Sequence, residues 1–91
     1  MKRGMILNDY VIAFSSFYKA MYAQEVLMSN GIRCTLQRLP AGVIQSCGYA
    51  LHVNGKTIHE AMDVLKRRNI LWMGAYMVEN VNGKANYRSI V

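Results

Sequence analysis

The sequence predicts an α+β fold, a two-layer sandwich with a four-stranded antiparallel sheet and both helices on one face. Strand-forming runs and segments of helical periodicity follow one another in the order β-α-β-β-α-β, and both halves of the chain share this pattern. Such an order is typical of the ferredoxin-like layout. The 91 residues suffice for one layered core, so we expect a single domain over 1–91. Its core should lie at about 10–78, with 1–8 and 80–91 as terminal extensions.

The first strand is predicted at Tyr10–Phe14, an apolar run rich in strand formers. Ser15 and Ser16 follow it and are candidates for a helix N-cap. The helical spacing of apolar residues then predicts a helix over Phe17–Asn30. Gly31 is placed to end this helix, because glycine readily adopts the backbone conformation that a helix C-terminus needs.

Strict alternation of apolar and polar residues predicts the second strand at Ile32–Gln37, with Cys34 on its core side. Pro40 breaks this pattern, so we expect a loop over 38–46. Alternation resumes at Tyr49–Val53, which is the predicted third strand.

The second helix is predicted to begin at Thr57, which with Glu60 fits a capping box. Leu71–Val78 is the predicted fourth strand. Asn82-Gly83 is a strong turn dipeptide, so Val81–Tyr87 is expected to fold back as a C-terminal hairpin extension.

The composition narrows the class of protein. A net charge of +6 suits an anionic partner or simple solubility. No apolar run approaches the roughly 20 residues of a membrane span, and no signal peptide is evident at the N-terminus. Two cysteines exclude a dense disulfide framework. We therefore expect a cytoplasmic protein that does not enter a membrane.

Cys47 is the main candidate for chemistry. It stands in Ser46-Cys47-Gly48, between the predicted loop and the third strand, where glycine allows a close approach of the backbone. A cysteine acts as a nucleophile or carrier only as the thiolate, which positive charge favours.

The charges around Cys47 in the sequence favour the thiolate. Residues 26–59 contain no acid, and they include Arg33, Arg38 and Lys56. We expect Arg38, and with less support Arg33 or Lys56, to lower the pKa of the thiol. The residues alone leave two interpretations open: a reactive thiol, or a small buried side chain at a strand start.

The remaining cysteine and the histidines form no predicted metal site. Cys34 is interpreted as core packing, although its spacing from Cys47 leaves a disulfide between them open. His52 and His59 do not combine with the cysteines in a zinc-binding spacing. No glycine-rich phosphate loop is present, so we expect neither a metal nor a cofactor.

The order and spacing of several short elements resemble a known family. These elements are Tyr10–Phe14 leading to Ser16, Ala20 and Ala23, Gly31-Ile32, Pro40, Ser46-Cys47-Gly48 with Ala50-Leu51, and Glu60-Ala61. Together they resemble the selenium/sulfur (Se/S) carrier-like family of small bacterial domains, over about residues 10–78.

This resemblance implies that Cys47 holds sulfur or selenium as a persulfide or selenopersulfide. The donor would be a cysteine desulfurase or a similar protein, and the cargo would pass to an acceptor protein. Ser46 and the Gly48 N–H are the expected hydrogen-bond donors to the bound anion, with Arg38 tuning the thiolate. A carrier or binding module is thus expected rather than an enzyme.

Two other functions remain as alternatives. The seven Met and six Tyr suit a protein-interaction or regulatory module, which would include a homodimer. In that interpretation Trp72, Tyr76 and Val78, assigned to one face of the fourth strand, form core or a dimer contact.

RNA binding is the lesser alternative. Tyr49 on the predicted third strand would stack a base, and Lys66-Arg67-Arg68 would contact phosphate. The aromatic motif of the common RNA-binding sheet domain is absent, so we do not expect a nucleic-acid partner.

Overall fold

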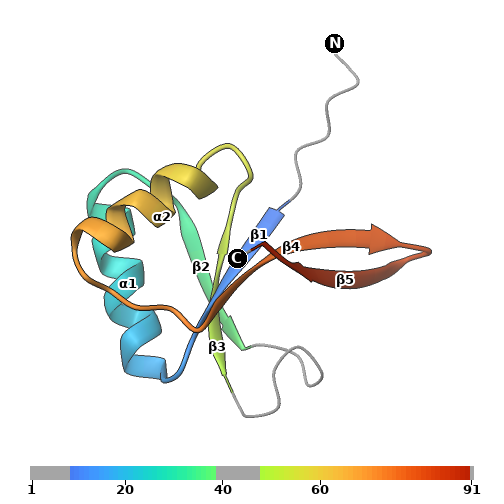
Figure 1. Cartoon of the computed structure of the whole chain (residues 1–91), viewed down its shortest axis with the longest axis horizontal. Helices are drawn as coiled ribbons and strands as arrows, with labels where there is room; N and C mark the ends of the chain where they lie inside the picture. Colours follow the sequence, from blue (N-terminus) through green and yellow to red (C-terminus); the bar gives the residue numbers. More distant parts are fainter. Residues whose placement is uncertain (1–8, 39–47, 91) are drawn as a thin grey trace.

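Two helices and five strands make up the described part of the chain (Figure 1). The computed structural model describes residues 9–38 and 48–90. In chain order the elements are β1 (Asp9–Phe14), α1 (Phe17–Ser29), β2 (Cys34–Arg38), β3 (Tyr49–Val53), α2 (Ile58–Arg67), β4 (Gly74–Val81) and β5 (Lys84–Ser89). The predicted α+β class is confirmed.

The strands form one antiparallel sheet in the order β2-β3-β1-β4-β5. The predicted four-stranded ferredoxin-like sheet therefore does not match exactly, because β5 adds a fifth strand beside β4. The cause is the Asn82-Gly83 turn, in which both residues have positive φ, 52° and 81°. Such a turn joins two antiparallel strands without splaying them. The predicted C-terminal hairpin is confirmed at this turn.

Both helices cover the same face of the sheet and enclose the main core (Figure 1). The strands contribute every second residue to this core, as expected for a sheet with one helix-covered face. Its buried members from the sheet are Ile12, Phe14, Leu51 and Val53, and those from the helices are Ala20, Ala23, Val26, Leu27, Ile58, Ala61, Val64 and Leu65.

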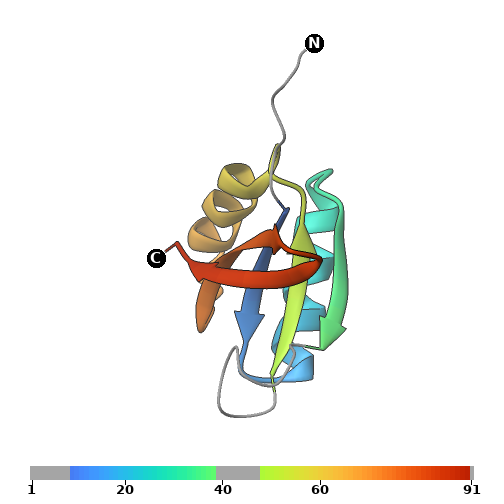
Figure 2. The ribbon, with the colours of Figure 1, turned by 90° about the vertical axis from the view of Figure 1, so that its right-hand side faces the viewer.

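A second, smaller core lies on the other face of the sheet. Val11, Ala13 and Ala50 are fully buried there. The hairpin of β4 and β5 curls across this face (Figure 2) and packs partly buried side chains against it. These side chains are Tyr76, Val78 and Tyr87. The C-terminal hairpin therefore belongs to the packing of the sheet.

Gly74 makes room for Tyr76 in this second core. A Cβ atom at position 74 would lie 2.8 Å from the Tyr76 hydroxyl oxygen and 3.1 Å from its ring. The tyrosine ring thus lies along the strand, over the backbone at Gly74. Glycine in a strand often marks such a close approach.

The ends of α1 follow the sequence signals. Ser16 is the N-cap, and its hydroxyl accepts a hydrogen bond of 3.2 Å from the Lys19 backbone N–H. Beyond the C-terminus, Gly31 has a φ of 79°. The backbone N–H of Ile32 then bonds to the Leu27 carbonyl at 2.9 Å, which satisfies one of the last helical acceptors.

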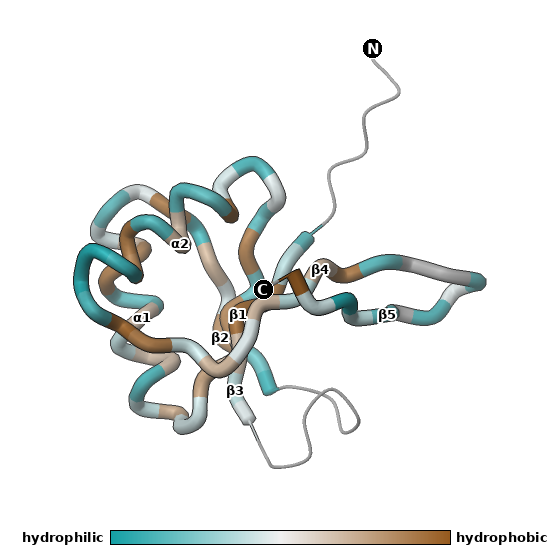
Figure 3. Tube along the Cα trace, viewed as in Figure 1, coloured by the Kyte–Doolittle hydropathy of each residue, from teal (hydrophilic) through white to brown (hydrophobic). Residues whose placement is uncertain are grey.

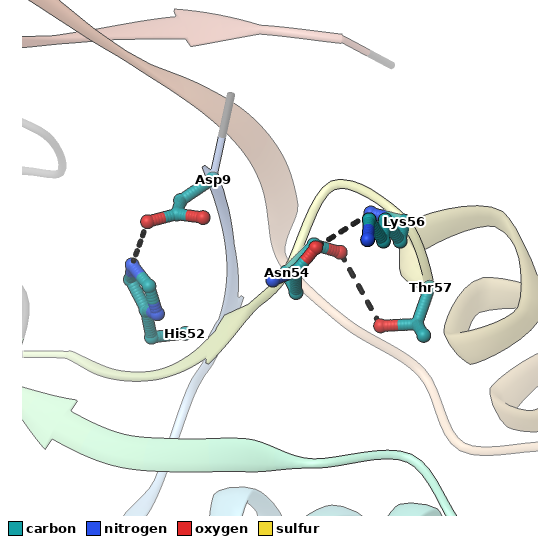
Figure 4. Close-up of polar contacts among 5 residues, drawn as sticks. All are labelled: Asp9, His52, Asn54, Lys56 and Thr57. Atoms are coloured by element: carbon teal, nitrogen blue, oxygen red, sulfur yellow. Dashed lines mark hydrogen bonds and ion pairs between the residues drawn. The ribbon is translucent and has the colours of Figure 1, made fainter. Parts of the chain in front are cut away.

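The start of α2 corrects a prediction. Thr57 is the N-cap, but its side chain makes no capping hydrogen bond, so the predicted capping box with Glu60 is wrong. The Thr57 hydroxyl instead donates to the Asn54 carbonyl at 3.3 Å. The Asn54 side chain accepts from the Lys56 backbone N–H at 2.8 Å, and this local turn competes with the cap (Figure 4).

Two aromatic residues, Tyr49 and Trp72, pack against the main core. Tyr49 packs against the main core beneath the helices, so it does not offer a base-stacking platform on the open face. β4 begins at Gly74 rather than Leu71, and Trp72 precedes it and packs against the main core. Trp72 therefore does not share a face with Tyr76, because the chain bends before β4 begins.

Hydropathy follows the layers of the fold. Figure 3 shows hydrophobic residues in the central strands and hydrophilic residues at the tip of the β4–β5 hairpin. Of the helices described, neither has the length and apolar character that crossing a membrane requires.

Candidate functional site

The candidate site is the end of the sheet where β2 ends and β3 begins. Arg38 and Tyr49 are paired across these strands. Ser46 and Cys47, the predicted hydrogen-bond donor and carrier thiol, lie outside the described residues. Gly48, which follows Cys47 in the chain, is described and is buried. The structure therefore describes the ends of the two strands, β2 and β3, between which the predicted thiol lies in the sequence.

Arg38 is the predicted tuning residue that lies at this end. It is exposed, and its guanidinium carbon is 5.8 Å from the centre of the Tyr49 ring. This distance is that of a cation–π contact, which holds the charge beside the start of β3. Arg33 and Lys56 precede β2 and α2 respectively, at the opposite end of the sheet. Their tuning role stays a prediction, since Cys47 lies outside the described residues.

The N-terminus of α1 lies at the same end. β1 ends at Phe14, which is paired with Tyr49, and α1 begins after a short connection. The Phe17 ring meets the Tyr49 ring edge to face, with centroids 5.4 Å apart. The first turn of α1 contains no acid. The backbone N–H groups at the start of a helix carry partial positive charge, and no acid in this turn offsets it.

The chain's acids all lie elsewhere in the fold. They are Asp9 at the start of β1, Glu25 in the second half of α1, Glu60 and Asp63 in α2, and Glu79 in β4. The elements that meet near Gly48 contribute Phe14–Lys19, Arg38, Gly48–Ala50 and Met73–Ala75, none of which is acidic. None of these segments brings a carboxylate to this end of the sheet. The charges that they do bring, Arg38 and the start of α1, favour an anion.

Cys34 occupies a different environment. It starts β2, at the other end of that strand from Arg38, and is a free cysteine packed partly buried against the main core. Its sulfur lies 4.0 Å from the Gln24 carbonyl oxygen, to which the thiol donates. Burial raises the pKa of the Cys34 thiol. The prediction that Cys34 is a packing residue is confirmed.

The histidines do not join the candidate site. His52 lies on the face of β3 opposite Tyr49, and its Nε2 is 3.2 Å from an Asp9 carboxylate oxygen (Figure 4). His59 is exposed on α2. Among residues 9–38 and 48–90, no group of three or more His, Cys, Asp or Glu side chains could hold a metal ion.

The comparison with protein families matches residues 9–77 to the model described as "Putative Se/S carrier protein-like". The chain belongs to this family. The match spans β1 to the middle of β4, and Ser46-Cys47-Gly48 falls within it. Among curated proteins, no relative matches the chain.

Some features of this Se/S carrier-like chain were not predicted from its sequence. The contact of Phe17 with Tyr49 depends on which strands are neighbours, and the order of strands was not predicted. The pair of Asp9 and His52 depends on the register of β1 with β3. No local sequence signal marked Phe17 for this contact.

Proposed function

We propose that this protein carries sulfur or selenium on Cys47, as a persulfide or selenopersulfide, and delivers it to an acceptor protein. The observation that carries the proposal is membership of the Se/S carrier-like family over a range that contains Cys47. Cys34 is less suited to this role, because its partial burial against the core raises the pKa of its thiol and disfavours the thiolate that transfer requires.

The charges at the end of β3 support this assignment. Arg38 and the first turn of α1 place positive charge near the buried Gly48. A thiolate and a persulfide anion are both stabilised by such surroundings. The Ser46 hydroxyl and the Gly48 N–H would donate hydrogen bonds to the bound anion.

The transfer step is a thiol exchange. The Cys47 thiolate attacks the outer sulfur of a donor persulfide, R–S–SH, and a new S–S bond forms on Cys47. The S–S bond of the donor breaks, and the donor leaves as the thiolate R–S⁻, which takes a proton from water. The same exchange with an acceptor thiol then releases the cargo. The donor would be a cysteine desulfurase or another sulfur or selenium donor.

The reactivity of the two thiols tests the environment that this proposal requires. In Cys34→Ser, which leaves Cys47 as the thiol, the rate of alkylation by iodoacetamide should reach half its maximum below the ordinary cysteine pKa of about 8.5. In Cys47→Ser, which leaves Cys34, the midpoint should lie above the ordinary value. Burial raises the pKa of Cys34, so its thiolate forms only at higher pH.

An additional Arg38→Ala change in the Cys34→Ser background should move the Cys47 midpoint upward. Lys84→Ala, which removes an exposed cation of β5, is the matched control and should leave it in place. A Cys47 midpoint at or above that of Cys34 contradicts the proposal. That result would favour the second function, an interaction module, which the exposed aromatic residues of α1 support.

A further inference from the structure

The outer side of α1 exposes several large apolar side chains, next to the charged Lys19 and Glu25. Tyr18 is 76% exposed and Tyr22 is 52% exposed, and Phe17 and Met21 are exposed beside them. The inner face of the same helix is buried in the main core. A surface helix normally carries mainly polar residues on its outer side, and a cluster of exposed large apolar side chains is typical of an interaction surface.

A pocket of about 270 Å³ adjoins this face. Lys19 and Tyr22 line it from α1, and the connection after α2 supplies the rest. Within that connection Leu71 is 82% exposed. Figure 3 shows hydrophobic residues in part of the chain between α2 and β4. The helix and the connection together form a surface that we call the α1 surface: Tyr18, Lys19, Tyr22, Arg68, Asn69, Ile70 and Leu71.

The charge of the α1 surface restricts its occupant. Lys19 and Arg68 line the pocket, and no acid does. The last turn of α2 adds Lys66 and Arg67 nearby. A complementary occupant presents an apolar side chain flanked by carboxylates. A second copy fits poorly, because a symmetric dimer would bring the cations of two identical surfaces together.

The α1 surface is continuous with the candidate site. The ring of Phe17 contacts Tyr18 on one side, with centroids 6.0 Å apart, and Tyr49 on the other. Tyr49 is the residue after Gly48, at the start of β3. A protein bound to the α1 surface would therefore lie beside the start of β3, which follows Cys47 and Gly48 in the chain.

We propose that the α1 surface docks an acidic, apolar segment of the protein that donates sulfur to Cys47. One apolar side chain of that segment enters the pocket, and its neighbouring carboxylates face Lys19 and Arg68. The proposal rests on the carrier function, since it names the chemistry of the partner that serves the same site.

Binding of a labelled peptide, Asp-Glu-Leu-Phe-Glu-Asp, tests the surface without any sulfur chemistry. Fluorescence anisotropy should detect binding to the full chain, and amide shifts in NMR spectra should centre on Tyr22, Asn69 and Leu71. Lys19→Glu with Arg68→Glu should weaken binding by about tenfold or more. Lys56→Glu with Lys84→Glu changes the net charge equally, at exposed positions outside the surface, and should weaken it far less. Leu71→Ser should also weaken binding, with no loss of folding, because this side chain is exposed.

Equal weakening by both charge-reversed pairs would mean attraction to net charge alone and would overturn the proposal. Amide shifts centred elsewhere would do the same. A stable dimer that Leu71→Ser dissociates would assign the surface to a second copy and also overturn it.

Sulfur transfer separates the docking proposal from the carrier function. Glutathione persulfide, a small donor, should load Cys47 equally in the wild type and in Arg68→Glu/Leu71→Ser, whereas loading by a cysteine desulfurase should fall in the variant. Equal loading by the desulfurase overturns the docking proposal and leaves the carrier function standing. Failure of both donors to load the wild type, with peptide binding intact, refutes the carrier function and with it the donor as the occupant.

Discussion

At the scale of single residues, the two cysteines show how neighbours decide the chemistry of one side-chain type. Cys34 was predicted from strand alternation to face the core, and it does so. Alternation works here because a strand covered by helices on one face sends every second side chain inward. No such pattern specifies reactivity, which depends on charges brought together from separate elements. Arg38 was predicted as a tuning residue from its proximity in sequence, but its placement depends on the pairing of β2 with β3.

Gly74 gives a prediction at this scale. Gly74→Ala should destabilise the protein by about 1 kcal/mol, because the new methyl group meets the Tyr76 ring and forces it away from the second core. Chemical denaturation of the wild type and of Gly74→Ala measures this loss in the free energy of unfolding.

The matched control is the same substitution in a Tyr76→Ala background. There the obstacle is gone, so Gly74→Ala should be neutral or slightly stabilising. The same loss in both backgrounds would show that the close approach of Tyr76 is not the reason for glycine at this position.

At the scale of elements, boundaries marked by a specific residue were predicted best. α1 begins after Ser16 as expected, and the turn at Asn82-Gly83 forms the predicted hairpin. β3 matches its prediction at both ends. The start of β4 was predicted too early, since an apolar run does not distinguish a strand from a buried connection. Alternation also placed Tyr49 correctly on the same face of its strand as Leu51 and Val53.

The N-cap of α1 gives a prediction at the scale of the element. Ser16→Ala removes the acceptor for the Lys19 N–H and should lower the free energy of unfolding by about 1 kcal/mol. The first turn should fray, so hydrogen exchange of the amides of Lys19 and Ala20 should accelerate.

Ser16→Asp retains a capping oxygen and adds a negative charge at the helix start, so it should preserve stability. The same charge should raise the pKa of Cys47, if that thiol lies near this helix end. Equal loss of stability in both variants would contradict a capping role for Ser16.

At the scale of the whole molecule, the fold keeps its acids away from one end of the sheet. That end gathers Arg38 and the first turn of α1, while the other end carries both signs of charge, with Asp9 and Glu60 beside Arg33 and Lys56. The helices form one layer, and the C-terminal hairpin covers part of the opposite face (Figure 2). Family membership covers this framework, whereas β5 lies beyond the matched range. The core architecture could be predicted from the sequence, but the acid-free end of the sheet could be recognised only once the strand order was known.

The central claim is that Cys47 carries the cargo. The most direct measurement is mass spectrometry of the chain after incubation with a cysteine desulfurase and cysteine, with peptide mapping to locate the added sulfur. We predict that the wild type and Cys34→Ser gain the mass of one sulfur atom on the peptide that contains Cys47. Cys47→Ser should gain none, and a reductant should remove the adduct. An adduct that persists in Cys47→Ser, or a wild-type chain that accepts no sulfur from the desulfurase or from a small persulfide, would contradict the claim.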